Sequence, residues 1–121
     1  MTGKPFVLTT QDRLKLRRAV LQRLRRGRRS AVRGKEMARE LRLPDDRKIR
    51  LVIRELISEG VPIASAVSEP MGFYIVINEH EAADYIRVLR ERIREDTARL
   101  RDFEKAVAHF DVPEQGQLWE G

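Results

Sequence analysis

Three arginines and a lysine are concentrated in the segment LPDDRKIRLVIRELISEG, residues 43–60. Arg47, Arg50 and Arg54 are three and four residues apart, a spacing that places their side chains on one face of an α-helix. A guanidinium can donate two parallel hydrogen bonds to a phosphate or to the major-groove edge of guanine. The spacing therefore predicts a helix with one face directed at a polyanion, and we interpret it as a DNA recognition helix.

The opposite face of this segment is apolar. Pro44, Asp45 and Asp46 are typical of a helix start, because proline is tolerated in a first turn and a carboxylate accepts N–H bonds there. Gly60 marks the end. In isolation the segment could equally be a solvated basic helix lying on a small core. The residues predicted to face the core are Ile49, Val52, Ile53, Leu56 and Ile57.

Length and composition limit the class of protein. A chain of 121 residues can form one small domain, with room for one extended appendage. It has no cysteine, which excludes disulfides, thiol nucleophiles and cysteine zinc sites and favours the cytoplasm. The longest apolar run is far shorter than a membrane span, and the N-terminus lacks the apolar core of a signal peptide. We therefore expect a soluble cytoplasmic protein.

The charges are distributed unevenly along the chain. Residues 1–60 hold 18 Lys or Arg against 7 Asp or Glu, a balance of +11, whereas residues 61–121 hold 7 against 12, a balance of −5. A strongly basic half is expected of a protein that binds a polyanion, through counterion release and electrostatic steering. An anionic membrane is the weaker alternative, because the exposed faces lack bulky aromatic side chains. The predicted partner is nucleic acid, with no membrane contact.

Two helices are predicted before the basic segment. The first opens with Thr9 and Asp12 at capping-box spacing and reaches about Arg26. A basic link at 28–32 could include a short strand, and the second helix begins at Gly34. The apolar residues of the two helices are Leu14, Leu16, Val20, Leu21 and Leu24, then Met37, Ala38 and Leu41.

A β-hairpin is predicted after the basic segment. Residues 63–67 and 73–77 are rich in β-branched and aromatic side chains, and SEPMG between them supplies Pro and Gly for the reversal. The predicted order is thus helix, short strand, helix, helix, strand, strand.

With the stretch GKEMARELRLPDDRKIRLVIRELISEGVPIASAVSEPMGFYIV, residues 9–78 resemble the winged helix-turn-helix family. The resemblance implies an α+β, mostly helical fold of three helices and a β-hairpin wing. In that family the third helix enters the major groove, which gives this role to Arg47, Lys48, Arg50 and Arg54. Leu51, on the same face, could touch a thymine methyl group or be a stray surface residue.

Phosphate contacts are expected from the segments flanking this helix. Arg33 and Lys35 lie at the start of the second helix, where basic side chains and backbone N–H groups both favour phosphate. Arg28 and Arg29 could clamp the DNA backbone or only solubilise the surface. The predicted wing tip, residues 68–72, has no basic residue, so wing contacts would be limited to Ser68 and main-chain N–H groups.

A long helix is predicted over 79–110, with Asn78 as its N-cap. Its apolar residues follow a heptad pattern interrupted at Asp96, so we expect a dimerising coiled coil. The alternative is that the helix folds back on its own domain, which we expect in part for residues 82–89. Arg99 would face Glu104 of a parallel partner, but the direction of pairing stays open. The predicted dimerisation residues are Ile86, Leu89, Ile93, Asp96, Leu100, Phe103, Val107 and Phe110.

Residues 1–8 and 111–121 are expected to be flexible, the first as an arm and the second as a tail. In the tail, Gln115, Leu118 and Trp119 resemble the sliding-clamp-binding peptide of bacterial replication and repair proteins. His80 and Asp84, four residues apart, could supply two metal ligands, but two ligands do not make a site. No nucleophile and base cluster is visible, so neither an enzyme, a metal nor a cofactor is predicted.

These patterns together predict a homodimeric, non-enzymatic, sequence-specific double-stranded DNA-binding protein associated with the nucleoid. A prokaryotic or phage transcription regulator is the expected class. The alternatives are a replication or repair accessory protein that docks on a sliding clamp, and a protein-interaction scaffold built on a winged-helix fold. The target sequence, an effector and the choice between activation and repression are not encoded in these patterns.

Overall fold

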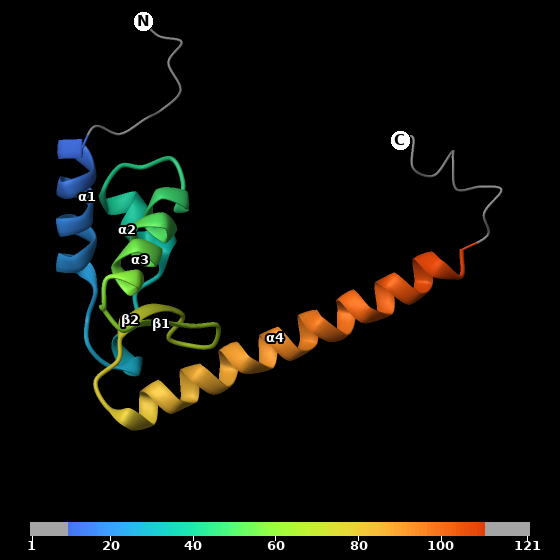
Figure 1. Ribbon diagram of the computed structural model, residues 1–121. Helices are drawn as coiled ribbons and strands as arrows, with labels where there is room; N and C mark the ends of the chain where they lie inside the picture. The colour runs from blue at the N-terminus through green and yellow to red at the C-terminus, as the bar shows by residue number, and fades with distance from the viewer. Residues whose placement is uncertain (1–9, 111–121) are drawn as a thin grey trace, which may run out of the picture. The chain divides into compact units, whose positions relative to one another are not determined.

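The computed structural model describes residues 10–110 and is an α+β, mostly helical protein (Figure 1). The chain divides into two compact units, with the boundary between Tyr85 and Ile86. The predicted order of the four helices and the two hairpin strands is confirmed. The elements are α1 (Thr10–Arg23), a 3₁₀ turn η1 (Arg28–Ser30), α2 (Gly34–Glu40), α3 (Arg47–Ser58), β1 (Ile63–Ala66), β2 (Gly72–Ile75) and α4 (Glu79–Ala108).

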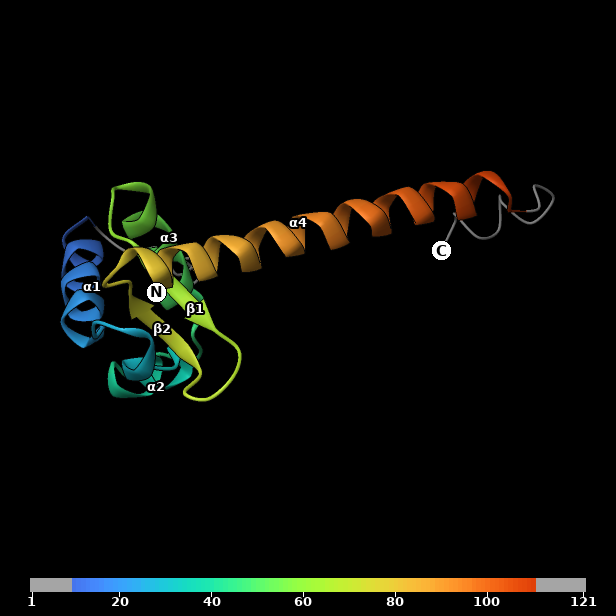
Figure 2. The same cartoon turned by 90° about the horizontal axis from the view of Figure 1, so that it is seen from below.

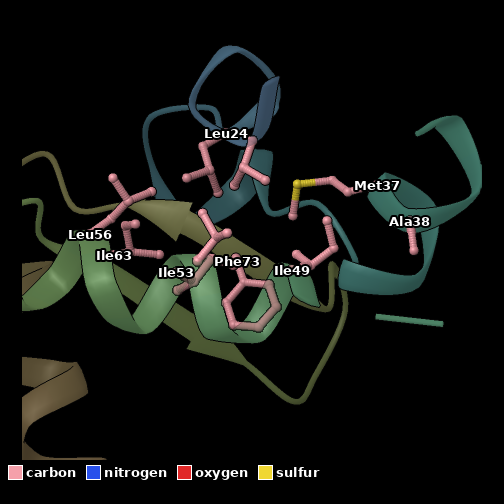
Figure 3. Close-up of a cluster of buried hydrophobic side chains, with 10 residues drawn as sticks. Leu24, Met37, Ala38, Ile49, Ile53, Leu56, Ile63 and Phe73 are labelled. Carbon is pink, nitrogen blue, oxygen red and sulfur yellow. The ribbon is translucent and has the colours of Figure 1, made fainter. Parts of the chain in front are cut away.

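The core of the first unit is centred on α3, which packs against α1, α2 and β1. Figure 3 shows the side chains of Ile49, Ile53 and Leu56 of α3 together with buried side chains from the other helices and the hairpin. Met37, Ile49, Leu56 and Val20 are the largest fully buried side chains. The whole cluster is Val20, Leu24, Met37, Ala38, Ile49, Val52, Ile53, Leu56, Ile63 and Phe73.

The predicted core faces of the helices are confirmed for most residues and are wrong at three. Ile57 is 46% exposed, because it lies at the edge of the α3 apolar stripe, beyond Leu56. Leu14 and Leu21 of α1 are 57% and 39% exposed. They lie to one side of the line through Leu16, Val20 and Leu24, so the packed stripe of α1 is narrower than the sequence suggests.

The ends of α1 and α3 also differ from the prediction. The first helix ends at Arg23 instead of Arg26, because the chain turns at Gly27 with φ of 96° and the Gly27 N–H donates to the Ile75 carbonyl at 2.8 Å. α3 begins at Arg47, so Pro44 lies before the helix and not in its first turn. Asp45 is the residue whose carboxylate accepts the Arg47 N–H, at 3.0 Å.

The strands β1 and β2 form an antiparallel hairpin (Figure 2). Ile63 lies opposite Ile75 and Ala66 opposite Gly72. The short strand expected in the 28–32 link is a single bridge at Val32. Its N–H donates to the Phe73 carbonyl at 2.9 Å, and its carbonyl accepts the Phe73 N–H at 2.8 Å. These two hydrogen bonds attach the link before α2 to β2.

The N-cap of α4 is Asn78, as predicted, since its side-chain oxygen accepts the Glu81 N–H at 2.8 Å. In a full capping box the Glu81 carboxylate would also accept the N–H of Asn78, and it does not do so here. Instead the Glu81 carboxylate accepts the N–H of Ile77 at 3.1 Å and the N–H of Arg28 at 2.9 Å. Thr9 of the other expected capping box lies outside the described residues. Between residues 10 and 110, no helix is long and apolar enough to cross a membrane.

Candidate nucleic-acid interface

The outer face of α3 carries the basic residues that the sequence placed there. Arg47, Arg50, Leu51 and Arg54 are exposed, and Lys48 is half-buried. The inner face of the same helix is anchored in the core. Within residues 10–110, the guanidinium groups of Arg47 and Arg54 form no ion pair with any carboxylate. α3 thus presents Arg47 and Arg54, without an ion pair among the described residues, next to the exposed Leu51.

Arg50 differs from the other arginines of α3 because its side chain is held in place. Its Nε donates to Asp46 Oδ2 at 3.0 Å, one turn earlier on the helix. Its guanidinium carbon lies 5.6 Å from the centre of the Phe73 ring, within the range of a cation–π contact. Phe73 belongs to the core, so the fold holds the ring that Arg50 contacts. The side chain is still 63% exposed.

Gly34, at the start of α2, allows α2, α3 and β2 to converge beside Arg50. A Cβ added to Gly34 would lie 3.2 Å from Phe73 Cε2 and 3.3 Å from Asp46 Oδ2. These distances are tighter than most real Cβ contacts. Glycine therefore permits the close approach that places Asp46 and Phe73 around Arg50.

Arg33, expected to contact phosphate, is paired with the acidic tip of the β1–β2 loop. Its Nη2 donates to Glu69 Oε2 at 3.0 Å, and the two side chains are 51% and 76% exposed. A pair this exposed contributes little to stability and opens at small cost. Lys35, the next basic residue, is exposed on α2.

Arg28 shapes the β1–β2 loop. Its guanidinium donates to the carbonyl of Pro70 at 2.8 Å and to the carbonyl and hydroxyl of Ser68 at 3.0 and 3.1 Å. It also lies over the Tyr74 ring, 5.9 Å from its centre. Burial, followed by the charge of Glu81, raises the pKa of the Tyr74 hydroxyl. Arg28 and Ser68, both expected to meet phosphate, are thus bonded to each other, whereas Arg29 is exposed.

A second set of ion pairs joins α1 to the C-terminal half of α3. Arg17 Nη1 donates to Glu59 at 3.0 Å and to Glu55 at 3.4 Å, and Arg13 also pairs with Glu55. The hydrogen bond from Arg17 lowers the pKa of the Glu59 carboxyl, and the bond to Glu59 raises the pKa of Arg17. Glu55 and Glu59 are thus paired with arginines of α1 and not with the arginines on the outer face of α3.

The predicted dimerisation residues lie along α4 and are mostly exposed, except that Phe110 follows the end of the helix, which is at Ala108 and not at 110 as predicted. Asp96, the polar interruption, pairs with Arg99 on the same helix at 3.4 Å. His80 and Asp84 are 3.4 Å apart, and residues 10–110 contain no group of three or more possible metal ligands. The candidate clamp motif, Gln115, Leu118 and Trp119, lies outside the described residues.

Three acidic residues near the basic surface were not predicted to act there: Asp46, Glu69 and Glu81. The Asp46–Arg50 pair is four residues apart and could have been found from helical spacing. The Arg33–Glu69 and Arg28–Glu81 contacts join residues 36 and 53 positions apart, for which the sequence carries no local signal.

No family model, no curated protein and no solved structure matches the chain.

Proposed function

We propose that this protein is a non-enzymatic, sequence-specific double-stranded DNA-binding protein built on a winged helix-turn-helix. The element order supports this fold: α1, the Val32 bridge strand, α2, α3 and then the β1–β2 hairpin as the wing. In this arrangement α3 enters the major groove, which is wide enough to admit a helix.

The observation that carries the proposal is the division of α3 into two faces. Ile49, Val52, Ile53 and Leu56 are buried, so the orientation of the helix about its axis is fixed. Arg47, Arg50 and Arg54 therefore all point away from the core. The alternative, a basic face that only contacts solvent, would not need Arg50 to lie over the Phe73 ring. Exposed arginines on a fixed helix are suited to bidentate contacts with guanine.

The surrounding basic residues position the DNA without reading it. Arg29, Arg33 and Lys35 lie on the segments before α3 and supply phosphate contacts. Arg28 contributes indirectly, because it holds the wing loop through Ser68 and Pro70. The wing tip is acidic at Glu69, so α3 and the segments ahead of it provide most of the binding energy.

Fluorescence anisotropy with labelled genomic duplexes tests the proposal on the full chain. We expect affinity to fall roughly a hundredfold between about 50 and 200 mM salt if about four phosphates are contacted. Arg47→Ala combined with Arg54→Ala should abolish discrimination between duplexes. Arg18→Ala, which removes an exposed arginine from α1, is the matched control and should leave discrimination unchanged.

Binding that is absent or insensitive to salt would refute the proposal. A stable complex with another protein, together with weak DNA affinity, would support the interaction scaffold instead. A transcription regulator of a prokaryote or phage, associated with the nucleoid, is the role that this binding mode fits best.

A further inference from the structure

The second unit carries an apolar stripe that no described residue covers. Ile93, Leu100 and Phe103 are 64%, 58% and 60% exposed, and α4 contains no buried residue. An apolar surface this continuous is unusual on a monomer and marks an interaction site. The stripe consists of Ile86, Leu89, Ile93, Asp96, Leu100, Phe103, Val107 and Phe110.

The spacing of the stripe identifies the kind of partner. Its residues alternate three and four apart, which is the 3.5-residue repeat of a coiled coil. We infer that a second copy of this chain covers the stripe, with the two α4 helices parallel and in register. Three of the four residues at the heptad a positions, Ile86, Ile93 and Val107, are β-branched, as parallel two-stranded coiled coils favour.

Charges flanking the stripe support the parallel direction. In register, Arg99 of one copy lies opposite Glu104 of the other, and the remaining flanking pairs between Ile86 and Ala108 contain no two charges of the same sign. In an antiparallel pair with Leu89 opposite Leu100, g positions face g positions and e positions face e positions, so Arg92 faces Arg99 and Arg90 faces the uncharged Thr97. That direction would place arginine against arginine.

Asp96 is the residue that makes the register specific. In a parallel pair the two Asp96 side chains occupy the same layer, and each is partly neutralised by Arg99 of its own helix at 3.4 Å. Arg92, one turn earlier, is the other nearby charge on the helix, and Thr97 of the other copy lies beside the layer. A single polar layer specifies register at a cost in stability. Replacing the charge with the isosteric amide should therefore strengthen association.

Parallel pairing has a structural consequence for the first unit. Because the chain enters the stripe from its N-terminal side in both copies, a parallel pair joins the two first units to the same end of the coiled coil.

Sedimentation equilibrium on the full-length chain, without DNA, tests self-association directly. We expect a dimer, loss of the dimer in Ile93→Asp, and a dimer that is about tenfold tighter in Asp96→Asn. Val88→Asp is the matched control, because Val88 is a 43% exposed apolar residue on α4 but off the stripe. It should dimerise as the parent does, and circular dichroism should show equal helix content in both aspartate variants. A monomeric parent, or equal loss in both variants, would overturn the inference.

Disulfide formation tests direction, since the chain has no native cysteine. In a parallel pair Leu89→Cys should crosslink with itself, because identical layers bring the two Cα atoms within about 7 Å. If Leu89→Cys fails to self-crosslink but joins Leu100→Cys in a mixture, the helices are antiparallel and the proposed direction is wrong. Neither experiment involves DNA, so a failure here would not contradict the proposed DNA binding. A failure to bind DNA would likewise not contradict the dimer.

Discussion

Arg50 Nε donates a hydrogen bond to Asp46 Oδ2 at 3.0 Å, and Asp46 is the residue immediately before α3, four positions ahead of Arg50. The bond uses Nε and not the terminal nitrogens Nη1 and Nη2. These two nitrogens are the pair that can contact guanine O6 and N7 together. Asp46 thus acts as a positioning residue in the proposed complex, since a guanidinium already held in place loses less side-chain entropy on binding.

Asp46→Asn should change affinity and discrimination in opposite directions. Removing a negative charge should strengthen binding to any duplex, whereas a looser Arg50 should cost about 1 kcal/mol of discrimination against a changed guanine. Arg50→Ala should cost about 1–3 kcal/mol of the same discrimination. Competition binding with a selected site and its single-base variants measures both quantities.

A uniform loss of affinity for all duplexes in Asp46→Asn would contradict the positioning role. Asp45→Asn is the useful comparison, because Asp45 bonds to the Arg47 backbone N–H and not to Arg50. It should lower helix stability slightly without altering discrimination at the guanine.

Glu69→Gln should strengthen DNA binding by releasing Arg33 from its 3.0 Å ion pair. We expect a gain of about two- to fivefold and a salt dependence steeper by about 0.9, the value for one more phosphate contact. Anisotropy titrations at several salt concentrations measure the slope. Glu40→Gln, which frees Arg23 from a 2.9 Å pair, removes the same net charge and is the control. Equal gains in both variants would show that net charge, and not Arg33, is responsible.

Acid should weaken the attachment of α1 to α3. The hydrogen bond from Arg17 lowers the pKa of the Glu59 carboxyl, so the unfolded chain binds its proton at a higher pH than the folded chain does. The stabilisation is fully present above the ordinary glutamate pKa of 4.5 and is lost as the pH falls through the lower folded value. Glu59→Gln should therefore lower Tm at pH 7 and flatten its dependence on pH below about 5.

Thermal unfolding between pH 3 and 7 checks this prediction. Glu95→Gln makes the same substitution at an exposed position on α4 and should keep the pH dependence of the parent. An unchanged profile in Glu59→Gln would mean that the Arg17 pair contributes nothing to acid sensitivity.

The sequence predicts what depends on local periodicity and misses what depends on long-range contacts. The buried face of α3 follows from the spacing of Ile49, Val52, Ile53 and Leu56, because a 3.6-residue period alone brings them together. Leu21 was misplaced because it directly follows Val20, and one residue rotates the side chain by about 100°. Whether a residue at the edge of the apolar stripe is buried depends on how far the neighbouring helices extend over that stripe.

The candidate interface divides in the same way. The outward direction of Arg47, Arg50 and Arg54 was predictable from the helix. The ring of Phe73 beneath Arg50 was not, because β2 reaches α3 only through the folded hairpin. The partner of Arg33 likewise depends on the path of a loop 36 residues away.

Gly72, at the start of β2, should tolerate no side chain. Its φ is 126°, and a Cβ there would lie 2.3 Å from the backbone carbon and oxygen of Val32, a contact that only backbone movement could relieve. Gly72→Ala should therefore cost roughly 3 kcal/mol or more of unfolding free energy.

Gly60 is the matched control, because its φ is 109° but no atom lies within 4 Å of an added Cβ. Gly60→Ala should show only the backbone strain, about 1–2 kcal/mol. Urea unfolding at equal m-values gives the difference between the two variants, which measures how closely β2 is packed on Val32. Equal losses would show that the segment around Val32, which continues to Arg33, can move away from β2.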